Sequence, residues 1–407
     1  MEKLWPCEFP GVHWMDEEEE RAVLNVLRSR TLFRHYGPAK PKYVEALEAA
    51  AREFYGVRYA LAVNSGTGAL CTAISALGIG PGDEVIIPSF MWVATVAAVV
   101  QANAIPVLCE VDDSFTMSAA DLERKITRRT RLILPVHMAG SPCDMDRIMV
   151  TAAQHGILVL EDVAQANGGT YQGRKLGTFG AMGIFSFQLN KNMTAGEGGL
   201  IVTNDERLYW RAFSAHDMSL FWRDAQPVDP EPDVLLWPQG RRMPELCGAV
   251  ASVQIRKLPR IIQHMQQSNR RIRSLLEGVP GLQLRRLNDP EGDTGPFLIF
   301  LLENETKAIQ VVQQMKQAGI HSAVRLADYG LHIYSNIPAL VQKTPLSPAG
   351  NPWSLAQNAQ SVSSYAKGAC PLSDALFARS ILLPIPSCLT EEQEHWAAEV
   401  IRKAATT

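Results

Sequence analysis

The sequence predicts an α/β protein with a mostly parallel sheet of seven strands and a second, smaller α/β domain. Two observations lead to this fold class. Short, continuous apolar runs alternate with helical patterns through the first 200 residues, and the chain is 407 residues long. Strands that are apolar along their whole length, with helices between them, are typical of a sheet covered on both faces. A chain of this length exceeds what one simple core usually supports.

The strands of the large domain are expected at the apolar runs. These are 59–63, 84–88, 105–109, 131–135, 157–161, 183–187 and 200–203. The turn 80–83 (Gly-Pro-Gly-Asp) ends one helix and begins the next strand. An acidic helix is expected at 16–28, before an irregular stretch at 31–38, and the Trp-, Pro- and Asp-rich stretch 217–240 predicts a loop.

The second domain follows a long helical pattern that begins near Leu246 and leads into it. We expect an N-terminal arm and large domain at 1–250 and a small domain at 251–407. In the small domain, a strand is predicted at 297–302 and helices at 307–318 and 391–405. The Ser-, Pro- and Gln-rich stretch 341–367 predicts a long loop that acts as a lid or an interface segment.

The composition argues against several classes of protein. The formal net charge of -3 gives no basic footprint for nucleic acid, and no apolar run is long enough to span a membrane. The N-terminus lacks the apolar core of a signal peptide. Seven scattered cysteines without a C-x-x-C pair predict neither a disulfide framework nor a metal site. We therefore expect a cytoplasmic protein.

The main chemical signal is a lysine and an upstream acid. Lys191 lies in a small-residue loop with Gly196, Gly198 and Gly199, and Asp162 ends the apolar run at 157–161. This pair has a well-known joint use with pyridoxal 5'-phosphate: the lysine forms a Schiff base and the acid pairs with the pyridinium nitrogen. A desolvated lysine loses basicity, as an imine-forming amine requires, and a released amine can move protons. A surface lysine and a helix-capping aspartate are the ordinary alternatives.

Further residues fit the same cofactor. Gly66 and Thr67 lie in a turn that follows a strand and opens a helix, and such a turn binds a phosphate through backbone amides. Ser186 can add a hydroxyl to this cradle. Trp92 follows a strand end and either stacks on a pyridine ring or belongs to the core. Gln165 is placed to bond the ring hydroxyl.

Five motifs occur together in the order typical of one family. They are Asn64-Ser65-Gly66-Thr67, Pro88-Ser89-Phe90-x-Trp92, Val136-His137-x-x-Gly140, Glu161-Asp162-x-Ala164-Gln165-Ala166, and Phe185-Ser186-Phe187-x3-Lys191-x4-Gly196-Glu197-Gly198-Gly199. The chain resembles the DegT/DnrJ/EryC1/StrS family of aminotransferases, from about residue 16 to the C-terminal helix.

The resemblance implies the fold type I architecture, similar to aspartate aminotransferase, and the transfer of an amino group from glutamate or glutamine to a keto-sugar or keto-cyclitol. It also implies a homodimer with shared active sites. Carried over by position, it makes Lys191 and Asp162 catalytic and places Gly66, Thr67, Ser186, Trp92 and Gln165 on the cofactor. Two segments, 289–293 and 370–374, loosely resemble the branch that aminates eight-carbon sugar acids at C8. A nucleotide-linked sugar is the other acceptor class considered.

Two positions depart from the family pattern. Gly240 stands where relatives carry an asparagine that reaches the partner subunit's phosphate, and Asn167 stands where a histidine is frequent. Either Arg241 makes the phosphate contact instead, or the contact between subunits differs.

The acceptor side of the site is less defined. The basic and aromatic residues expected near it are Phe33, Arg34, His35, Tyr36, His137 and Arg325, with the 217–240 loop. Two other functions remain as alternatives within the family. They are a sugar dehydratase, in which histidine replaces the lysine, and a non-catalytic regulator, which would have lost the lysine or the acid.

Overall fold

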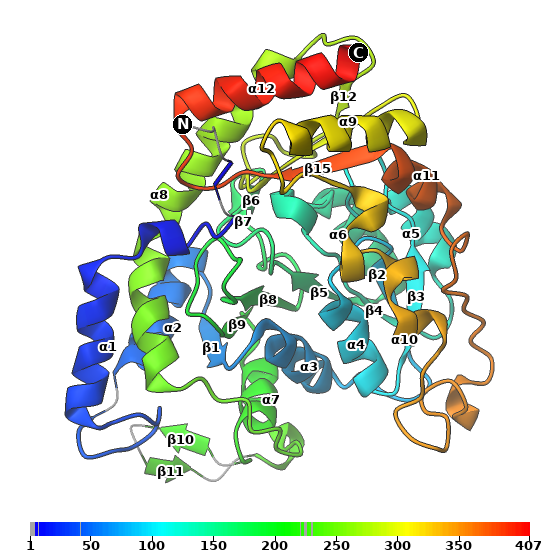
Figure 1. The fold of residues 1–407 in the computed structure, drawn as a ribbon. Coiled ribbons are helices and arrows are strands. Elements are labelled where there is room, and N and C mark those ends of the chain that lie inside the picture. Colours follow the sequence, from blue (N-terminus) through cyan, green and yellow to red (C-terminus); the bar gives the residue numbers. More distant parts are fainter. Residues whose placement is uncertain (1–4, 7, 41, 220, 224–225, 229–230) are drawn as a thin grey trace.

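The computed structural model describes residues 5–6, 8–40, 42–219, 221–223, 226–228 and 231–407. Two sheets organise the chain (Figure 1). A seven-stranded sheet lies at the centre of the larger part, and a four-stranded sheet lies beside it under the C-terminal helix. The predicted fold class is confirmed.

The large sheet has the strand order β1-β9-β8-β5-β4-β2-β3. Its strands are β1 (Tyr59–Val63), β2 (Glu84–Pro88), β3 (Ile105–Cys109), β4 (Thr130–Ile133), β5 (Leu158–Asp162), β8 (Met182–Ser186) and β9 (Gly199–Thr203). Strands β3, β2, β4, β5 and β8 run parallel, and β9 is antiparallel to both β8 and β1. Each strand therefore forms at a predicted apolar run.

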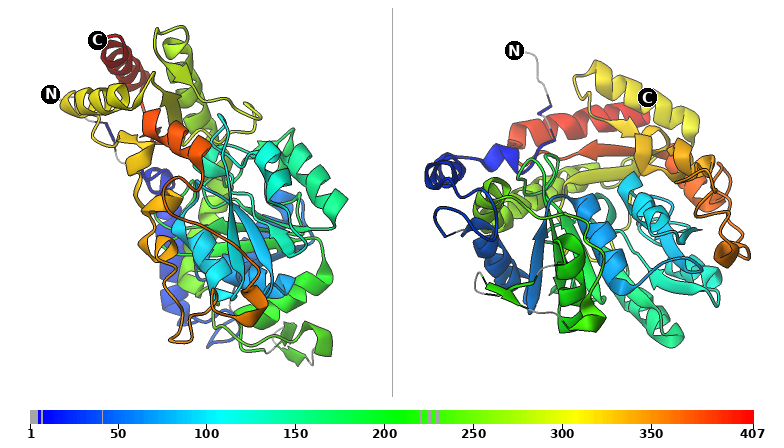
Figure 2. Two further views of the ribbon diagram at one scale, coloured as in Figure 1. Left: turned by 90° about the vertical axis from the view of Figure 1, so that its right-hand side faces the viewer. Right: turned by 90° about the horizontal axis from the view of Figure 1, so that it is seen from below.

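Helices cover both faces of this sheet, as Figure 2 shows. One apolar core contains residues of α3 (Gly66–Leu77), α4 (Val93–Gln101) and α7 (Glu206–His216). The other contains residues of α2 (Tyr43–Tyr55), α5 (Ala119–Lys125), α6 (Met145–His155) and α8 (Glu245–Leu276). Because both faces are covered, the strands are apolar along their whole length.

The small sheet is antiparallel, with the order β12-β13-β15-β14. Its strands are β12 (Gln283–Leu284), β13 (Phe297–Leu301), β14 (Val324–Arg325) and β15 (Ser380–Pro384). Helices α9 (Glu305–Gln317) and α12 (Glu391–Thr406) pack against it and form the third apolar core with the end of α8. The expected boundary at residue 250 falls inside α8. This helix contributes to one core of the large sheet and to the core of the small sheet.

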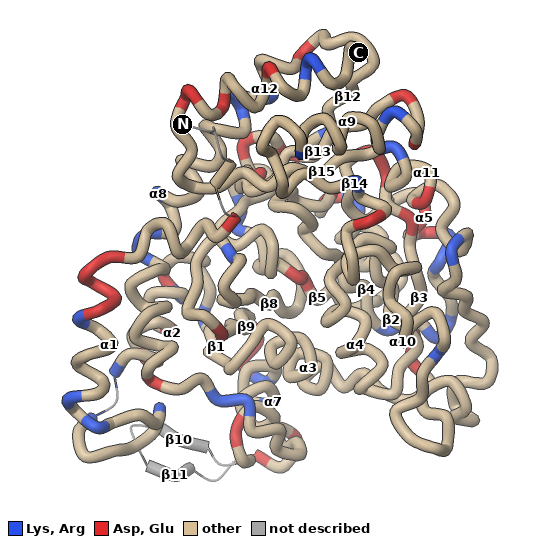
Figure 3. Tube along the Cα trace, viewed as in Figure 1, with Lys and Arg blue, Asp and Glu red and all other residues tan. Residues whose placement is uncertain are grey.

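The N-terminal segment joins the two parts. Trp5 is buried in the core of the small sheet, where its indole N–H donates to the Pro384 carbonyl oxygen at 3.0 Å. The chain then continues to α1 (Glu17–Ser29), which packs on α8. Helices α1 and α12 both begin with glutamates and carry a basic residue in the last turn, as the helix dipole favours (Figure 3).

The remaining elements are short. They are β6 (Thr170–Tyr171), β7 (Arg174–Lys175), β10 (Phe221–Arg223), β11 (Gln226–Val228), α10 (Pro338–Val341), α11 (Pro371–Arg379) and the 3-10 helices Val12–Trp14, Met138–Gly140, Pro232–Val234, Leu326–Asp328, Gly330–His332, Tyr334–Asn336 and Ala356–Asn358.

The prediction of a loop at 217–240 was wrong, because β10 and β11 pair as antiparallel strands there. Residues 220, 224–225 and 229–230 of that segment lie outside the described residues. No described helix is long and apolar enough to cross a membrane.

Candidate active site

A cavity of about 400 Å³ opens at the carboxyl ends of β5 and β8, where open α/β sheets place their ligands. Both sheets and the N-terminal segment contribute to its wall. The lining includes Ser65, Gly66, Thr67, Trp92, Asp162, Gln165, Ser186 and Lys191 from the large sheet side, Glu8 and Pro10 from the N-terminal segment, and Pro296, Phe297, Tyr329, His332 and Pro384 from the small sheet side. Seven predicted site residues, all of this large-sheet group except Ser65, therefore meet at one cavity.

Asp162 is the buried acid of this cavity. It is the last residue of β5, and its carboxylate accepts the Thr95 hydroxyl at 2.9 Å and the Ala164 backbone N–H at 3.0 Å. Burial raises the pKa of Asp162, while these two donors and the charges of Lys191 and His137 lower it. A carboxylate in this setting is stabilised further by a cationic ligand group, such as a protonated pyridine nitrogen.

Lys191 is the buried amine on the same wall. Burial lowers the pKa of Lys191, and the negative charges of Asp162, Glu8 and Glu197 act in the opposite direction. The backbone holds the lysine on both sides: its N–H donates to the Gln188 carbonyl at 3.0 Å, and its carbonyl accepts from Gly11 at 3.2 Å. Its amine is therefore less basic than a surface lysine and better suited to act as a nucleophile.

The start of α3 forms an anion cradle at one end of the cavity. Ser65 is the N-cap of the helix, and its side chain accepts the Gly68 N–H at 2.9 Å. The following amides and the helix dipole favour a phosphate. Gly66 lies so close to β8 that a Cβ added to it would be 2.7 Å from the Ser186 Cβ. This contact keeps the Ser186 hydroxyl beside the helix start.

Arg241 lies at the same helix start. Its Nη1 donates to the Gly68 carbonyl at 3.2 Å and lies 3.5 Å from the Thr67 carbonyl, and its own carbonyl accepts from Asn64. It does not line the cavity, but it approaches the cradle within its own chain. The Arg241 guanidinium thus bonds backbone carbonyls at the start of α3, and the direct phosphate contact predicted for it stays a prediction.

The middle of the cavity suits a flat ring. Trp92 is the N-cap residue of α4 and is 42% exposed, and its ring centroid lies 4.7 Å from that of His332. Gln165 uses its Oε1 to accept the Ala139 N–H at 3.1 Å, which leaves its Nε2 as a donor for a ligand oxygen. The cavity thus supplies an acid, an amine, an anion cradle and an aromatic face, which fit pyridoxal phosphate.

The residues expected to face the acceptor are not at this cavity. Arg34 pairs with Glu48 at 2.8 Å, His35 pairs with Asp217 at 2.6 Å, and Phe33 stacks edge-on against Tyr36. Arg325 pairs with Glu305 and Asp328 on the small sheet side. These five residues contact the protein itself, and in this chain they do not line the cavity.

His137 requires the same correction. Its ring is fully buried, 3.2 Å from Glu161, and its Nδ1 accepts the Cys143 N–H. Burial lowers the pKa of His137, but the contacts with Cys143 and Glu161 outweigh it and raise the pKa to about 10. His137 therefore holds the strand ends together beneath the site rather than facing a substrate.

Several cavity residues were not predicted from the sequence. Tyr329 and His332 stack at 4.1 Å between ring centroids, and both lie in an irregular segment without periodic pattern. Glu8 and Pro10 come from far upstream. Thr95 also lines the cavity and was not predicted. Its position could have been inferred from the sequence, because it lies about one helical turn after Trp92.

The fold and the cavity define an α/β protein with a buried lysine and a buried acid at the carboxyl ends of its strands, in a pocket that fits pyridoxal phosphate. The model of the DegT/DnrJ/EryC1/StrS aminotransferase family matches residues 13–346, and the chain belongs to this family.

Named relatives agree with this family. The chain is 35% identical over 248 residues to GDP-perosamine synthase of Vibrio cholerae, covering 60% of this chain and 65% of the relative. It is 48% identical over 168 residues to GDP-perosamine synthase of Caulobacter vibrioides, covering 41% of this chain and 45% of the relative. The matches thus span about half to two thirds of those relatives.

Solved structures resemble the whole fold. The structure of 3-amino-5-hydroxybenzoic acid synthase has a TM-score of 0.80 at 26% identity and covers 100% of this chain and 99% of its own. The structure of S. venezuelae DesV in complex with a ketimine intermediate has a TM-score of 0.79 at 28% identity and covers 96% of this chain and 95% of its own.

Proposed function

We propose that this chain is a pyridoxal-phosphate-dependent aminotransferase that moves an amino group from glutamate or glutamine to the keto or aldehyde group of a sugar. The observation that carries the proposal is the cavity in which Lys191 and Asp162 meet the start of α3. Bound pyridoxal phosphate would carry the amino group between donor and acceptor. Family membership supports the same reaction class.

Each residue of the cavity has a physical task in this proposal. The amides at the start of α3 and the Ser186 hydroxyl would hold the phosphate. Asp162 would supply a negative charge to the ring nitrogen, and the donors Thr95 and Ala164 favour that charge. The Nζ of Lys191 would take and return a proton, since burial keeps its pKa below that of a free lysine.

A sugar linked to a nucleotide is the acceptor we favour. Two of the relatives are named GDP-perosamine synthase, and this name refers to a nucleotide-linked sugar. The segments that resemble the branch for eight-carbon sugar acids, 289–293 and 370–374, do not line the cavity. Both segments make contacts elsewhere in the protein. Asp293 pairs with Arg285, and Ser373 bonds Glu110.

Presence of both reactive groups argues against the two alternatives. A dehydratase of this family carries a histidine in place of the lysine, and a regulator would have lost the lysine or the acid. Here Lys191 and Asp162 are both present and both buried.

The test combines purified holoenzyme with glutamate or glutamine and a panel of keto-sugars, including GDP-linked ones, and measures aminated product by mass spectrometry. We expect product from one donor and at least one acceptor, and none from Lys191→Ala. The control Lys316→Ala changes an exposed lysine on α9 and should match the wild type. Product from Lys191→Ala at the wild-type rate would contradict the proposal.

We also propose a cytoplasmic homodimer with shared active sites, in which the large domain ends near residue 250. The support is the family resemblance. The proposal does not rely on position 240, because Gly240 lacks the asparagine side chain with which relatives reach the partner subunit's phosphate. Light scattering that gives the mass of a single chain at micromolar concentration would contradict the dimer.

A further inference from the structure

A second cavity, of about 370 Å³, lies away from the active site, between the C-terminal half of α8 and the segment that precedes β13. Four arginines line it: Arg270, Arg273, Arg285 and Arg286. Two acids, Glu277 and Asp293, line it too. More basic than acidic side chains line the cavity, and acids outside the lining pair with two of the arginines.

Arg285 is the buried centre of this cavity. Its side chain is 1% exposed, and its Nη2 donates to the Asp293 carboxylate at 2.9 Å and to the Ala139 carbonyl at 2.9 Å. Among the described residues, its Nε and Nη1 have no hydrogen-bond partner. An arginine presents five N–H donors, and donors buried without acceptors are costly. The unpaired donors therefore indicate an acceptor that the chain itself does not supply.

Two of the other arginines are already neutralised. Arg270 pairs with Glu291 at 2.8 Å, and Arg286 pairs with Asp112 at 2.9 Å and Asp113 at 2.7 Å.

Arg273 is different. Its Nη2 donates to the Arg285 backbone carbonyl at 3.1 Å, and no described carboxylate lies within ion-pair distance of it. Burial lowers the pKa of both Arg273 and Arg285, and the charge of Asp293 raises it. A bound anion would act in the same direction as Asp293. The cavity thus offers one cation without a paired acid beside a buried guanidinium with free donors.

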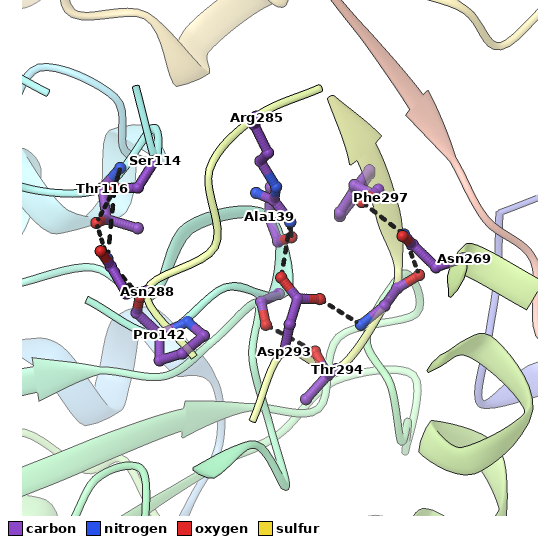
Figure 4. A network of polar contacts seen from close by, with 12 residues as sticks. Ser114, Thr116, Ala139, Pro142, Asn269, Arg285, Asn288, Asp293, Thr294 and Phe297 are labelled. Carbon is purple, nitrogen blue, oxygen red and sulfur yellow. Dashed lines mark hydrogen bonds and ion pairs between the residues drawn. The ribbon is translucent and has the colours of Figure 1, made fainter. Parts of the chain in front are cut away.

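Arg285 also connects this cavity with the active site. Figure 4 shows Arg285 together with Ala139 and Asp293. Arg285 holds the Ala139 carbonyl, and the Ala139 N–H is the group that positions Gln165 in the active-site wall. Thr294 donates to the Gly140 carbonyl at 2.9 Å through its backbone. One residue, Ala139, therefore separates Arg285 from Gln165, which lines the active site.

A second connection runs along the chain itself. Gly295 lines the arginine cavity, and Pro296 and Phe297, which follow it directly, line the active site. A Cβ on Gly140 would be 2.3 Å from the Pro296 Cδ, so the two segments are packed without free space. A shift of this segment must move part of the active-site wall.

We propose that the arginine cavity is a second ligand site that binds the phosphate or carboxylate group of a small molecule, and that its occupation is transmitted to the active site through Ala139 and residues 293–297. Guanidinium groups bind both kinds of oxyanion through charge-assisted hydrogen bonds. The site is independent of the proposed reaction, because none of its arginines lines the active-site cavity.

The test is isothermal titration calorimetry of the cofactor-loaded protein with inorganic phosphate and, separately, with malonate. We expect saturable binding of at least one probe, and the probe that binds identifies phosphate or carboxylate as the ligand chemistry. In Arg273→Gln, the affinity should fall about tenfold or more, since one charge-assisted bond is lost. The control is Arg256→Gln, which removes an arginine of the same helix that also bonds a backbone carbonyl, and it should bind as the wild type does.

Hydrogen exchange provides the second readout, and it does not depend on activity. Exchange at residues 138–140 and 293–297 should slow when the ligand binds to wild type and should not change in Arg273→Gln. Absence of saturable binding, or equal binding in Arg273→Gln and wild type, would overturn the site. Binding without any change of exchange at 138–140 would overturn the coupling. Arg285→Lys, which keeps the charge with fewer donors, should also bind more weakly than wild type.

Discussion

Burial acts in opposite directions on the two reactive side chains of the active site. It lowers the pKa of Lys191 and raises that of Asp162, so burial opposes the charged form of both groups. A ligand with a cationic ring nitrogen would stabilise the charged acid, and an amine of lowered basicity is better suited to act as a nucleophile. The site is thus built to be completed by its ligand.

Thr95→Val tests how Asp162 is kept charged. The variant removes the hydroxyl that donates to the carboxylate at 2.9 Å, with little change of volume. Loss of a bond to a charged group costs about 1.5–3 kcal/mol, so the rate of amine transfer should fall roughly tenfold or more. Because that hydroxyl lowers the pKa of Asp162, the acid side of the pH–rate profile should move to higher pH.

A control for this variant is Thr151→Val, which changes another buried threonine on α6, outside the cavity. Its profile should coincide with that of the wild type. A Thr95→Val profile that also coincides would show that the Asp162 contact has no catalytic effect.

His332 makes stability depend on pH. Burial, with a smaller effect of the Lys191 charge, lowers the pKa of His332 from 6.5 to about 4. The folded state therefore favours the neutral ring. Above pH 6.5 the ring is neutral in both states and stability is unaffected, whereas the free energy of unfolding falls as the pH drops from 6.5 to about 4. Between these values the urea midpoint of wild type should fall more steeply than that of His332→Asn.

The matched variant is His155→Asn, which changes an exposed histidine at the end of α6. It should keep the steep wild-type decline. Parallel curves for wild type and His332→Asn would contradict the role of this ring.

Individual residues differ in how well the sequence predicts them. Lys191, Asp162, Gln165 and Ser186 lie next to strand ends within short motifs, so local spacing was enough to bring them together. His332 and Glu8 reach the cavity only through the packing of distant segments, which leaves no local pattern. Arg34 and His35 look like ligand-binding residues because they are polar, but in the fold their side chains contact Glu48 and Asp217.

At the scale of elements, the contact between α3 and β8 determines the phosphate end of the site. The helix can start beside Ser186 because Gly66 has no side chain there. A glycine at this position allows the backbone to approach closely, and its φ is not in the left-handed region.

Gly66→Ala tests this contact. The new Cβ would lie 2.7 Å from the Ser186 Cβ and 2.9 Å from its Oγ, so the helix start must shift away from the strand. We expect the affinity for pyridoxal phosphate to fall about tenfold, as for the loss of one charge-assisted bond, in an equilibrium dialysis measurement.

Gly80→Ala is the control, because a Cβ there meets only the Ala102 carbonyl at 3.9 Å. It should bind the cofactor as wild type does. Equal affinity in Gly66→Ala and Gly80→Ala would show that the helix start does not hold the phosphate.

The elements that the sequence predicts best are those buried on both sides. The strands of the large sheet are continuous apolar runs, and their positions follow from that pattern within about two residues. The hairpin of β10 and β11 and the short strands β12 and β14 lack such a pattern. Their pairing depends on neighbours that are remote in sequence.

At the scale of the whole molecule, the N-terminal segment connects the two sheets across the active site. Trp5 packs in the small-sheet core, Glu8 and Pro10 line the cavity, and α1 packs on α8. No pattern in the sequence indicates this path. The domain division predicted from the sequence therefore placed the whole segment with the large sheet.

Trp5→Ala tests the strength of this connection. It removes a side chain that is 8% exposed and whose ring centroid lies 6.4 Å from that of Trp396. Truncation of a buried tryptophan costs about 3–5 kcal/mol, so the free energy of unfolding should fall by roughly that amount.

The comparison is Trp237→Ala, since Trp237 is 92% exposed. Its stability should stay within about 0.5 kcal/mol of wild type. If Trp5→Ala is equally mild, the N-terminal segment does not hold the two sheets together.

The most direct test of the central claim is chemical labelling of the lysine. Purified protein is loaded with pyridoxal phosphate, reduced with borohydride, digested and analysed by peptide mass spectrometry. We expect the cofactor mass on Lys191 alone, lost when the amino donor, glutamate or glutamine, is added before reduction, and absent from Lys191→Ala. Labelling of a different lysine, or labelling at Lys191 that neither glutamate nor glutamine changes, would contradict the claim.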